Sequence, residues 1–220
     1  MIVPTTPERF LLEFLPAFVA DIGAPSGPGN AGSPAGVDAG ARRRRRPAGA
    51  GIAVRVVGVG EWTLRLEERA LRVGAGMADD VALQLSLNER DFEPLVLEPT
   101  RRALAASSAN GEAAAARALA AKGFWLRLGR FDDETAELLR QQQGRILVRI
   151  DDAGTSRNVA LTPGLQPYSL DSAECCIDCE IAALEAVQDK RKNPLDLFYE
   201  GQIRITGDAQ IALAMAGLFL

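Results

Sequence analysis

Apolar side chains recur at helical spacing near the N-terminus. The stripe consists of Phe10, Phe14 and Phe18, flanked by Leu11, Leu15 and Val19. Thr6 followed by Pro7 is a typical helix start, because Thr caps the first amides and Pro tolerates the first helical position. We therefore predict an amphipathic helix within residues 1–21, kinked at Pro16. The stripe favours a helix that faces the core, with a lid over an apolar cavity as the alternative.

Alternating apolar positions predict two series of β-strands further along the chain. The first series covers residues 52–56, 62–66, 71–73 and 81–87, and the second covers 145–150, 159–161, 175–181 and 202–206. Four strands in succession favour an antiparallel sheet with one buried face. Helical patterns follow at 88–96, ending near Pro99, at 100–122 and at 182–190, and an apolar helix opens at Asp208. Asn193 and Pro194 mark a turn.

The two series resemble each other. Residues 52–56 match 146–150, 64–66 match 159–161, the strand and helix from Val81 match those from Glu174, and 123–129 match 201–207. We therefore predict two related units, 52–143 and 144–220, with chance similarity of alternating strands as the alternative.

Residues 22–51 differ from both units in composition. Gly, Pro, Ala and Ser dominate, and no periodic apolar pattern is present, which is typical of a flexible linker. Five consecutive arginines, Arg42, Arg43, Arg44, Arg45 and Arg46, lie within it. Such a run is solvated and favours disorder. Transient contact with an anionic membrane surface, nucleic acid or an acidic partner stays open as the function of this run.

The composition excludes several kinds of chemistry. The 220 residues contain no histidine, which removes histidine bases, triads and metal ligands. A net charge of −4 argues against nucleic acid as a partner of the whole chain. Cys175, Cys176 and Cys179 form no spaced disulfide framework and favour a reducing, cytoplasmic location. Side chains alternate along a strand, so no pair of these thiols suits a metal chelate, and we expect neither a metal nor a cofactor.

The remaining motifs are weak. The apolar stretch from Phe10 to Ala20 is interrupted by Glu13 and Pro16, so we expect no signal peptide, and no run is long enough to span a bilayer. The acid pairs at 79–80 and 151–152 resemble turn and strand-end residues rather than a catalytic dyad. The glycines of 58–60 and 74–76 lack the spacing of a phosphate-binding loop.

Residues 193–220 resemble the C-terminal signature of the sterol carrier protein 2 (SCP2) family. They read Asn-Pro-Leu-Asp-Leu-Phe-Tyr-Glu-Gly-Gln-Ile-Arg-Ile-Thr-Gly-Asp, followed by an apolar helix. Arg204 stands where the family commonly has lysine, and Gln202 replaces the other basic residue. The strand and helix of 173–187 and the helix of 7–16 are similar to family elements. The resemblance is good over 144–220 and weaker over 52–143.

The resemblance implies an α+β fold of SCP2 type, in which helices cover an antiparallel-rich sheet and enclose an apolar cavity. Together with the apolar pattern, it makes Phe198, Ile203, Ile205, Ile211, Met215, Leu218 and Phe219 the expected ligand-binding residues. Gly201 and Gly207 are expected in turns, and Asp208 as the cap of the last helix. No catalytic residue is expected.

The function that follows is binding or transfer of a hydrophobic small molecule, such as a lipid, fatty acyl or isoprenoid chain. Apolar burial of about 25 cal/mol per Å² drives such binding with few polar contacts. One alternative is an accessory protein that delivers a hydrophobic substrate to biosynthetic enzymes and so has a protein partner. Another is an enzyme that uses Asp or Glu as acid or base, which a buried carboxylate pointing into the pocket would favour.

Overall fold

The computed structural model describes residues 2–23, 51–67, 70–108, 133–188 and 191–216. The predicted linker, including Arg42–Arg46, lies outside these residues except at its two ends, where a helix closes at Gly23 and a strand begins at Gly51. Within the described part of the chain, no helix combines the length and apolar character needed to cross a membrane.

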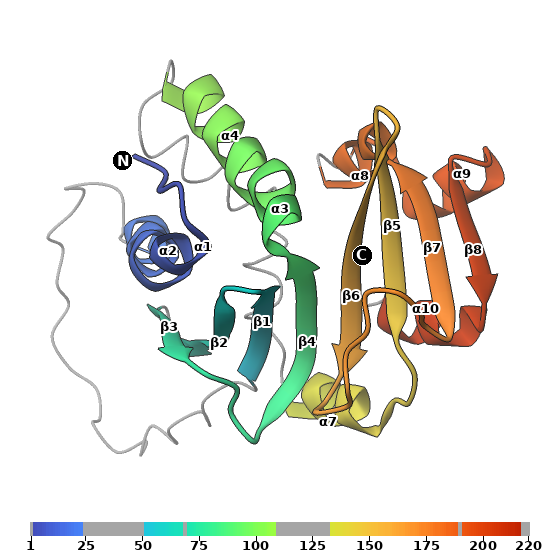
Figure 1. Cartoon of the computed structure of the whole chain (residues 1–220), viewed down its shortest axis with the longest axis horizontal. Helices are drawn as coiled ribbons and strands as arrows, with labels where there is room; N and C mark the ends of the chain where they lie inside the picture. Colours follow the sequence, from blue (N-terminus) through green and yellow to red (C-terminus); the bar gives the residue numbers. More distant parts are fainter. Residues whose placement is uncertain (1, 24–50, 68–69, 109–132, 189–190, 217–220) are drawn as a thin grey trace, which may run out of the picture.

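One sheet of eight strands runs through the molecule in the order β3-β2-β1-β4-β6-β5-β7-β8 (Figure 1). The strands are β1 (Gly51–Val57), β2 (Gly60–Glu67), β3 (Ala70–Ala75), β4 (Val81–Asn88), β5 (Ile146–Asp152), β6 (Thr155–Pro163), β7 (Cys175–Glu180) and β8 (Ile203–Gly207). The pairs β1–β4 and β5–β7 are parallel, and all other neighbours are antiparallel. The predicted α+β class and antiparallel-rich sheet are confirmed.

The two halves of the sheet have the same local arrangement. In each half, the first strand of a hairpin also pairs with a later parallel strand, giving β2-β1-β4 and β6-β5-β7, and in the first half β3 comes between the hairpin and that strand. This differs from the fully antiparallel first series that the strand pattern favours, because alternation does not determine which edge a strand joins. β4 and β6 pair with each other, so the halves share one sheet. Their relation as two repeated units stays a prediction.

The helices lie before, between and after the strands. They are α1 (Pro7–Arg9), η1 (Phe10–Phe14), α2 (Leu15–Gly23), α3 (Glu89–Phe92), η2 (Glu93–Leu97), α4 (Glu98–Ser108), α7 (Asp133–Gln141), α8 (Ile181–Gln188), α9 (Pro194–Tyr199) and α10 (Ala209–Ala216), where η marks π-helical turns. The rest of the helix predicted for 100–122 lies outside the described residues. A short helix, α9, occupies the place where the sequence indicated only a turn.

Prolines do not end the two long helices. The amide of Leu15 donates to the carbonyl of Phe10, and the amide of Glu98 donates to that of Glu93, so each bond spans five residues. Pro16 and Pro99 follow directly. A π-turn widens the helix by one residue, which lets the chain pass a proline ring that would clash in a regular α-helix. The helix stop predicted near Pro99 is therefore wrong.

The N-terminal helix packs on the core face of the sheet, the side that carries Ile52 and Leu83. Phe10, Phe14 and Phe18 are all buried in the same hydrophobic cluster as these two residues. Their rings stack at centroid distances of 5.2 Å and 5.7 Å, and Phe92 meets Phe10 edge-on. The predicted core-facing stripe is confirmed.

The opposite face of the sheet is crossed by residues 164–174, which we call the strap, and it carries both polar side chains and a small apolar cluster of Leu147, Ala160 and Leu170. The side-chain amide of Gln84 donates to the carbonyls of Gly164 (2.7 Å) and Gln166 (2.9 Å). The Tyr168 ring lies 4.1 Å from the guanidinium of Arg55. The strap therefore covers this face with hydrogen bonds, a cation–π contact and the buried Leu170, which leaves the core face as the side suited to an apolar ligand.

Candidate functional site

Four aliphatic side chains form a row across the second half of the sheet. They are Val159, Val148, Ile177 and Ile205, each the register partner of the next. Register partners lie side by side on one face, so this apolar row crosses four strands, roughly 14 Å at 4.8 Å per strand. All four are partly buried and pack against the main core. The row is a continuous apolar surface of a length that suits a hydrocarbon chain or ring system.

Helix α10 extends this surface at one end. Ile211 and Ala212 are each 8% exposed and belong to the core cluster against which the apolar row packs. Ile211 also lines an open pocket of about 520 Å³ together with Gly144, Gln166 and Glu174. The pocket thus has an apolar side chain from α10 among polar groups from the loops around it.

The structure brings together only part of the predicted ligand set. Ile205 lies in the apolar row, and Ile203 lies two residues earlier on the same face as the register partner of Cys179. Ile211 lies nearby in the same core cluster. Met215 belongs to α10 by its backbone, and Leu218 and Phe219 lie outside the described residues.

Phe198 lies elsewhere. It is 43% exposed on α9, and its ring contacts Tyr199 at a centroid distance of 5.8 Å. It is neither in the core cluster nor among the residues packed against it. A two-turn helix offers too few positions for periodicity to show which side docks, so its sequence pattern could not reveal this outward placement.

Three residues of the apolar row were not among those expected from the sequence. Val148, Val159 and Ile177 read as strand positions, and their alternation was visible. What was missing is the order of the strands, since a side chain on β5 meets one on β7 only after the pairing is known.

The turn before α10 has the geometry that its residues favour. Gly207 has φ 84°, and a Cβ there would lie 2.2 Å from the carbonyl oxygen of Glu174. The Asp208 amide donates to this same oxygen at 2.8 Å, and the Asp208 carboxylate accepts from the Gln210 amide at 2.9 Å. The turn therefore fixes where α10 starts relative to β7 and β8.

An ion pair stands at the rim of the Ile211 pocket. The guanidinium of Arg145 donates to the carboxylate of Glu174 at 2.9 Å, and the Arg145 amide donates to the same group at 2.8 Å. The hydrogen bond from the Arg145 side chain lowers the pKa of Glu174 to about 2. Both groups stay charged at neutral pH. The pair therefore holds the residues before β5 and β7 together and is not suited to proton transfer.

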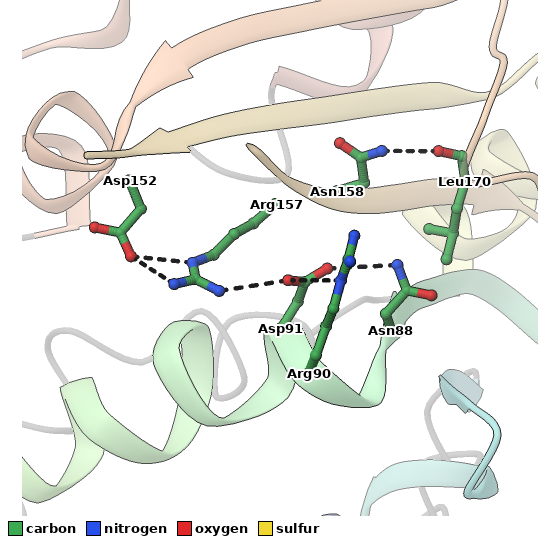
Figure 2. A network of polar contacts seen from close by, with 7 residues as sticks. All are labelled: Asn88, Arg90, Asp91, Asp152, Arg157, Asn158 and Leu170. Carbon is green, nitrogen blue, oxygen red and sulfur yellow. Dashed lines mark hydrogen bonds and ion pairs between the residues drawn. The ribbon is translucent and has the colours of Figure 1, made fainter. Parts of the chain in front are cut away.

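Among the described residues, one carboxylate is deeply buried, in the network shown in Figure 2. Asp91 on α3 is 1% exposed and accepts from Arg157 at 3.5 Å and from Asn88 at 3.4 Å. Arg157 also donates to Asp152 at 2.8 Å. Asp91 does not line the pocket beside Ile211. It also does not line a second pocket, which lies between the β1–β2 turn and Tyr168. Its contacts are those of a structural ion pair between α3 and the β5–β6 hairpin.

The three thiols are free. Burial raises the pKa of Cys175, and burial with the nearby charge of Asp178 raises that of Cys179 to about 11. These two thiols are therefore protonated at neutral pH and poor nucleophiles. Cys175 and Cys179 face the core side of β7, while Cys176 faces the strap.

Comparison with known proteins gives one family. The model of the SCP-2 sterol transfer family matches residues 126–220. No curated protein matches the chain. Similar solved structures include sterol carrier protein 2 from Yarrowia lipolytica (17% identity, 40% of this chain and 74% of that one, TM-score 0.31).

Two further similar structures come from insects. Sterol carrier protein 2 like 2 from Aedes aegypti is 16% identical, over 53% of this chain and 96% of that one, with a TM-score of 0.31. The sterol carrier protein domain 2 of Helicoverpa armigera is 14% identical, over 60% and 89%, with a TM-score of 0.34. The resemblance seen in residues 193–220 is confirmed by the family match, and residues 126–220 are identified with the SCP-2 sterol transfer family.

Proposed function

We propose that the protein binds a hydrophobic small molecule, such as a lipid, fatty acyl or isoprenoid chain, and transfers it. The observation that carries this proposal is the apolar row, which lies on the core face within the part of the chain matched by the family. Each buried CH₂ group of a ligand contributes about 0.8 kcal/mol, so such a seat needs few polar partners. The specificity of this seat would follow from the length and shape of the ligand.

The seat is assigned to the second half of the sheet. In the first half, Phe10, Phe14 and Phe18 of the N-terminal helix already cover the core face and are at most 6% exposed. Side chains packed this closely leave no room for a ligand without moving the helix. The aliphatic side chains of the apolar row are only partly buried. One ligand per chain is therefore expected.

A titration with a fluorescent fatty acid tests the seat. The double variant Ile177→Thr, Ile205→Thr keeps β-branched side chains in β7 and β8 but places hydroxyls in the middle of the row. We expect its affinity to fall at least tenfold, about 1.4 kcal/mol. Val59→Thr is the matched control, because Val59 is 39% exposed in the β1–β2 turn, away from the row.

Thermal unfolding of each variant shows whether a loss of affinity reflects a loss of fold. If a folded double variant binds the fatty acid with unchanged affinity, the ligand does not bind at the apolar row. Native mass spectrometry of the purified full chain would then identify the co-purified molecule. A stoichiometry of two ligands per chain would contradict the assignment to one half.

A further inference from the structure

Four polar side-chain atoms are buried without a hydrogen-bond partner in the described part of the chain. They are Arg55 Nε, Ser86 Oγ, Asn158 Oδ1 and Thr162 Oγ1. Each belongs to a residue that is next to a core-facing one along its strand, so all four side chains point to the strap face. The charge of Arg55 is balanced by Glu61 at 2.6 Å, and only its Nε is left unpaired. Such atoms destabilise the conformation that buries them.

The register of the strands places these four side chains together. Ser86 on β4 is the partner of Arg55 on β1 and of Ala160 on β6. Asn158 and Thr162 lie two residues to either side of Ala160, and therefore on the same face. The four side chains occupy one area, three strands wide, which we call the buried polar patch.

The middle of the strap makes contacts over this patch. The Tyr168 ring lies 4.1 Å from the Arg55 guanidinium. The carbonyl of Leu170 accepts from Asn158 Nδ2 at 3.0 Å (Figure 2). In this position of the strap, the four unpaired atoms are closed to water. Water therefore reaches them only if the strap moves.

The strap is attached at its two ends by groups other than those of the patch. At its start, the Gln84 side chain donates to the carbonyls of Gly164 and Gln166. At its other end, Glu174 pairs with Arg145 at 2.9 Å. These contacts involve neither Tyr168 nor Leu170, so they hold the ends when the middle leaves the sheet.

The middle of the strap has a turn of its own. The Ser169 hydroxyl accepts from the amides of Asp171 at 3.2 Å and Ser172 at 3.1 Å. These bonds are local and do not depend on the sheet. Leu170 is 9% exposed, and its side chain packs with Leu147 in the small apolar cluster. Leaving the sheet thus exposes one leucine and breaks two polar contacts, while four polar atoms gain water.

We propose that residues 167–173 of the strap open and close over the buried polar patch. Burial of Leu170 favours the closed strap, and hydration of the unpaired atoms favours the open one. Because these contributions oppose each other, the two positions differ little in free energy, and the open one is populated in the folded protein. The strap lies on the face opposite the apolar row. The proposal therefore goes beyond ligand binding and does not depend on it.

Limited proteolysis of the full chain tests the proposal. Chymotrypsin cleaves after Tyr168 when the strap is open, and mass spectrometry separates this cut from cuts elsewhere in the chain. When opening is fast relative to cleavage, the rate follows the population of the open form. We expect this rate to change little in low urea, since local opening exposes little surface. Global unfolding, followed by circular dichroism, depends steeply on urea.

A variant outside the strap changes the opening without changing the cleaved sequence. Ser86→Ala with Thr162→Val removes two unpaired hydroxyls and keeps the size of both side chains. The closed strap then buries fewer unpaired atoms, so cleavage after Tyr168 should slow at least tenfold, about 1.4 kcal/mol. Ser156→Ala with Thr206→Val is the matched control, because both residues are exposed on the same face. It should leave the rate unchanged.

Three results would overturn the proposal. One is the absence of any cut after Tyr168 while the unaltered protein is folded. Another is a cleavage rate that rises with urea as steeply as global unfolding. The third is equal or faster cleavage in a folded Ser86→Ala, Thr162→Val variant, which would show that the hydroxyls have partners, such as bound water, beneath a closed strap. Thermal unfolding of both variants checks that they are folded.

Discussion

Gly201 and Gly207 differ only in the space around them. Both have positive φ, 75° and 84°. A Cβ at Gly201 would meet nothing within 4 Å, whereas one at Gly207 would lie 2.2 Å from the carbonyl oxygen of Glu174, the residue before β7. The left-handed backbone alone disfavours a side chain by about 1–2 kcal/mol. The clash at Gly207 adds a cost that backbone atoms cannot relieve without moving.

Alanine substitution at the two glycines should therefore separate these effects. We expect Gly201→Ala to lower the free energy of unfolding by about 1 kcal/mol and Gly207→Ala by at least about 3 kcal/mol. Urea unfolding followed by circular dichroism measures both. Equal losses would show that the turn before α10 shifts to make room.

The pH dependence of the Arg145–Glu174 pair can also be predicted. The folded state holds the pKa of Glu174 at about 2, below its ordinary 4.5. A carboxylate with a lowered folded pKa stabilises the fold above the unfolded pKa, and this stabilisation is lost as the pH falls from about 4.5 to about 2. The Glu174 side chain is 46% exposed, so solvent reduces the pair to about 0.2–1 kcal/mol.

Glu174→Gln should thus destabilise the protein at pH 7 by up to about 1 kcal/mol and have little effect at pH 2. Unfolding curves of both proteins across this range measure the difference. A gap that stays constant with pH would show that the difference between the two proteins does not come from the charge of the Glu174 carboxylate.

At the scale of elements, the N-terminal helix shows what a pattern predicts well. Its four-residue stripe was long enough to indicate one buried face, and the structure buries that face. The alternating strands were also visible one by one. The parallel pairs β1–β4 and β5–β7 were not, because pairing depends on contacts between distant segments. The helix through Pro99 was missed because a π-turn leaves no signal in apolar spacing.

A substitution at Phe14 tests how much the N-terminal helix stabilises the first half of the sheet. Its ring lies between those of Phe10 and Phe18, and it is 5% exposed. Phe14→Ala should destabilise the protein by about 3–5 kcal/mol, since the cavity cannot be filled by the stacked neighbours. Fatty acid affinity of the folded variant should be unchanged, because the seat is assigned to the apolar row. Chemical unfolding and the titration together check both statements.

At the scale of the whole molecule, the two halves are joined in two ways. β4 pairs with β6, which makes the sheet continuous. The Asp91–Arg157 pair adds a buried charged link from α3, in the first half, to β6, in the second (Figure 2). The alternating patterns of the two strand series were visible in the sequence, and the relation of the halves as repeated units stays a prediction. This link could not, since Asp91 and Arg157 lie 66 residues apart and neither belongs to a motif.

Removing one charge of this link should be more harmful than removing both. Asp91→Ala leaves Arg157, 17% exposed, without a buried counter-charge, and a broken buried pair costs about 3–5 kcal/mol. In Asp91→Leu with Arg157→Met, neither charge remains, and apolar side chains fill the space, so most of that stability should return.

Asp152→Ala is the matched control, because Asp152 is a more exposed partner of the same guanidinium. Denaturant unfolding should show Asp91→Ala with a lowered midpoint or with two transitions, one for each half. A midpoint unchanged by Asp91→Ala would show that β4–β6 pairing alone couples the halves.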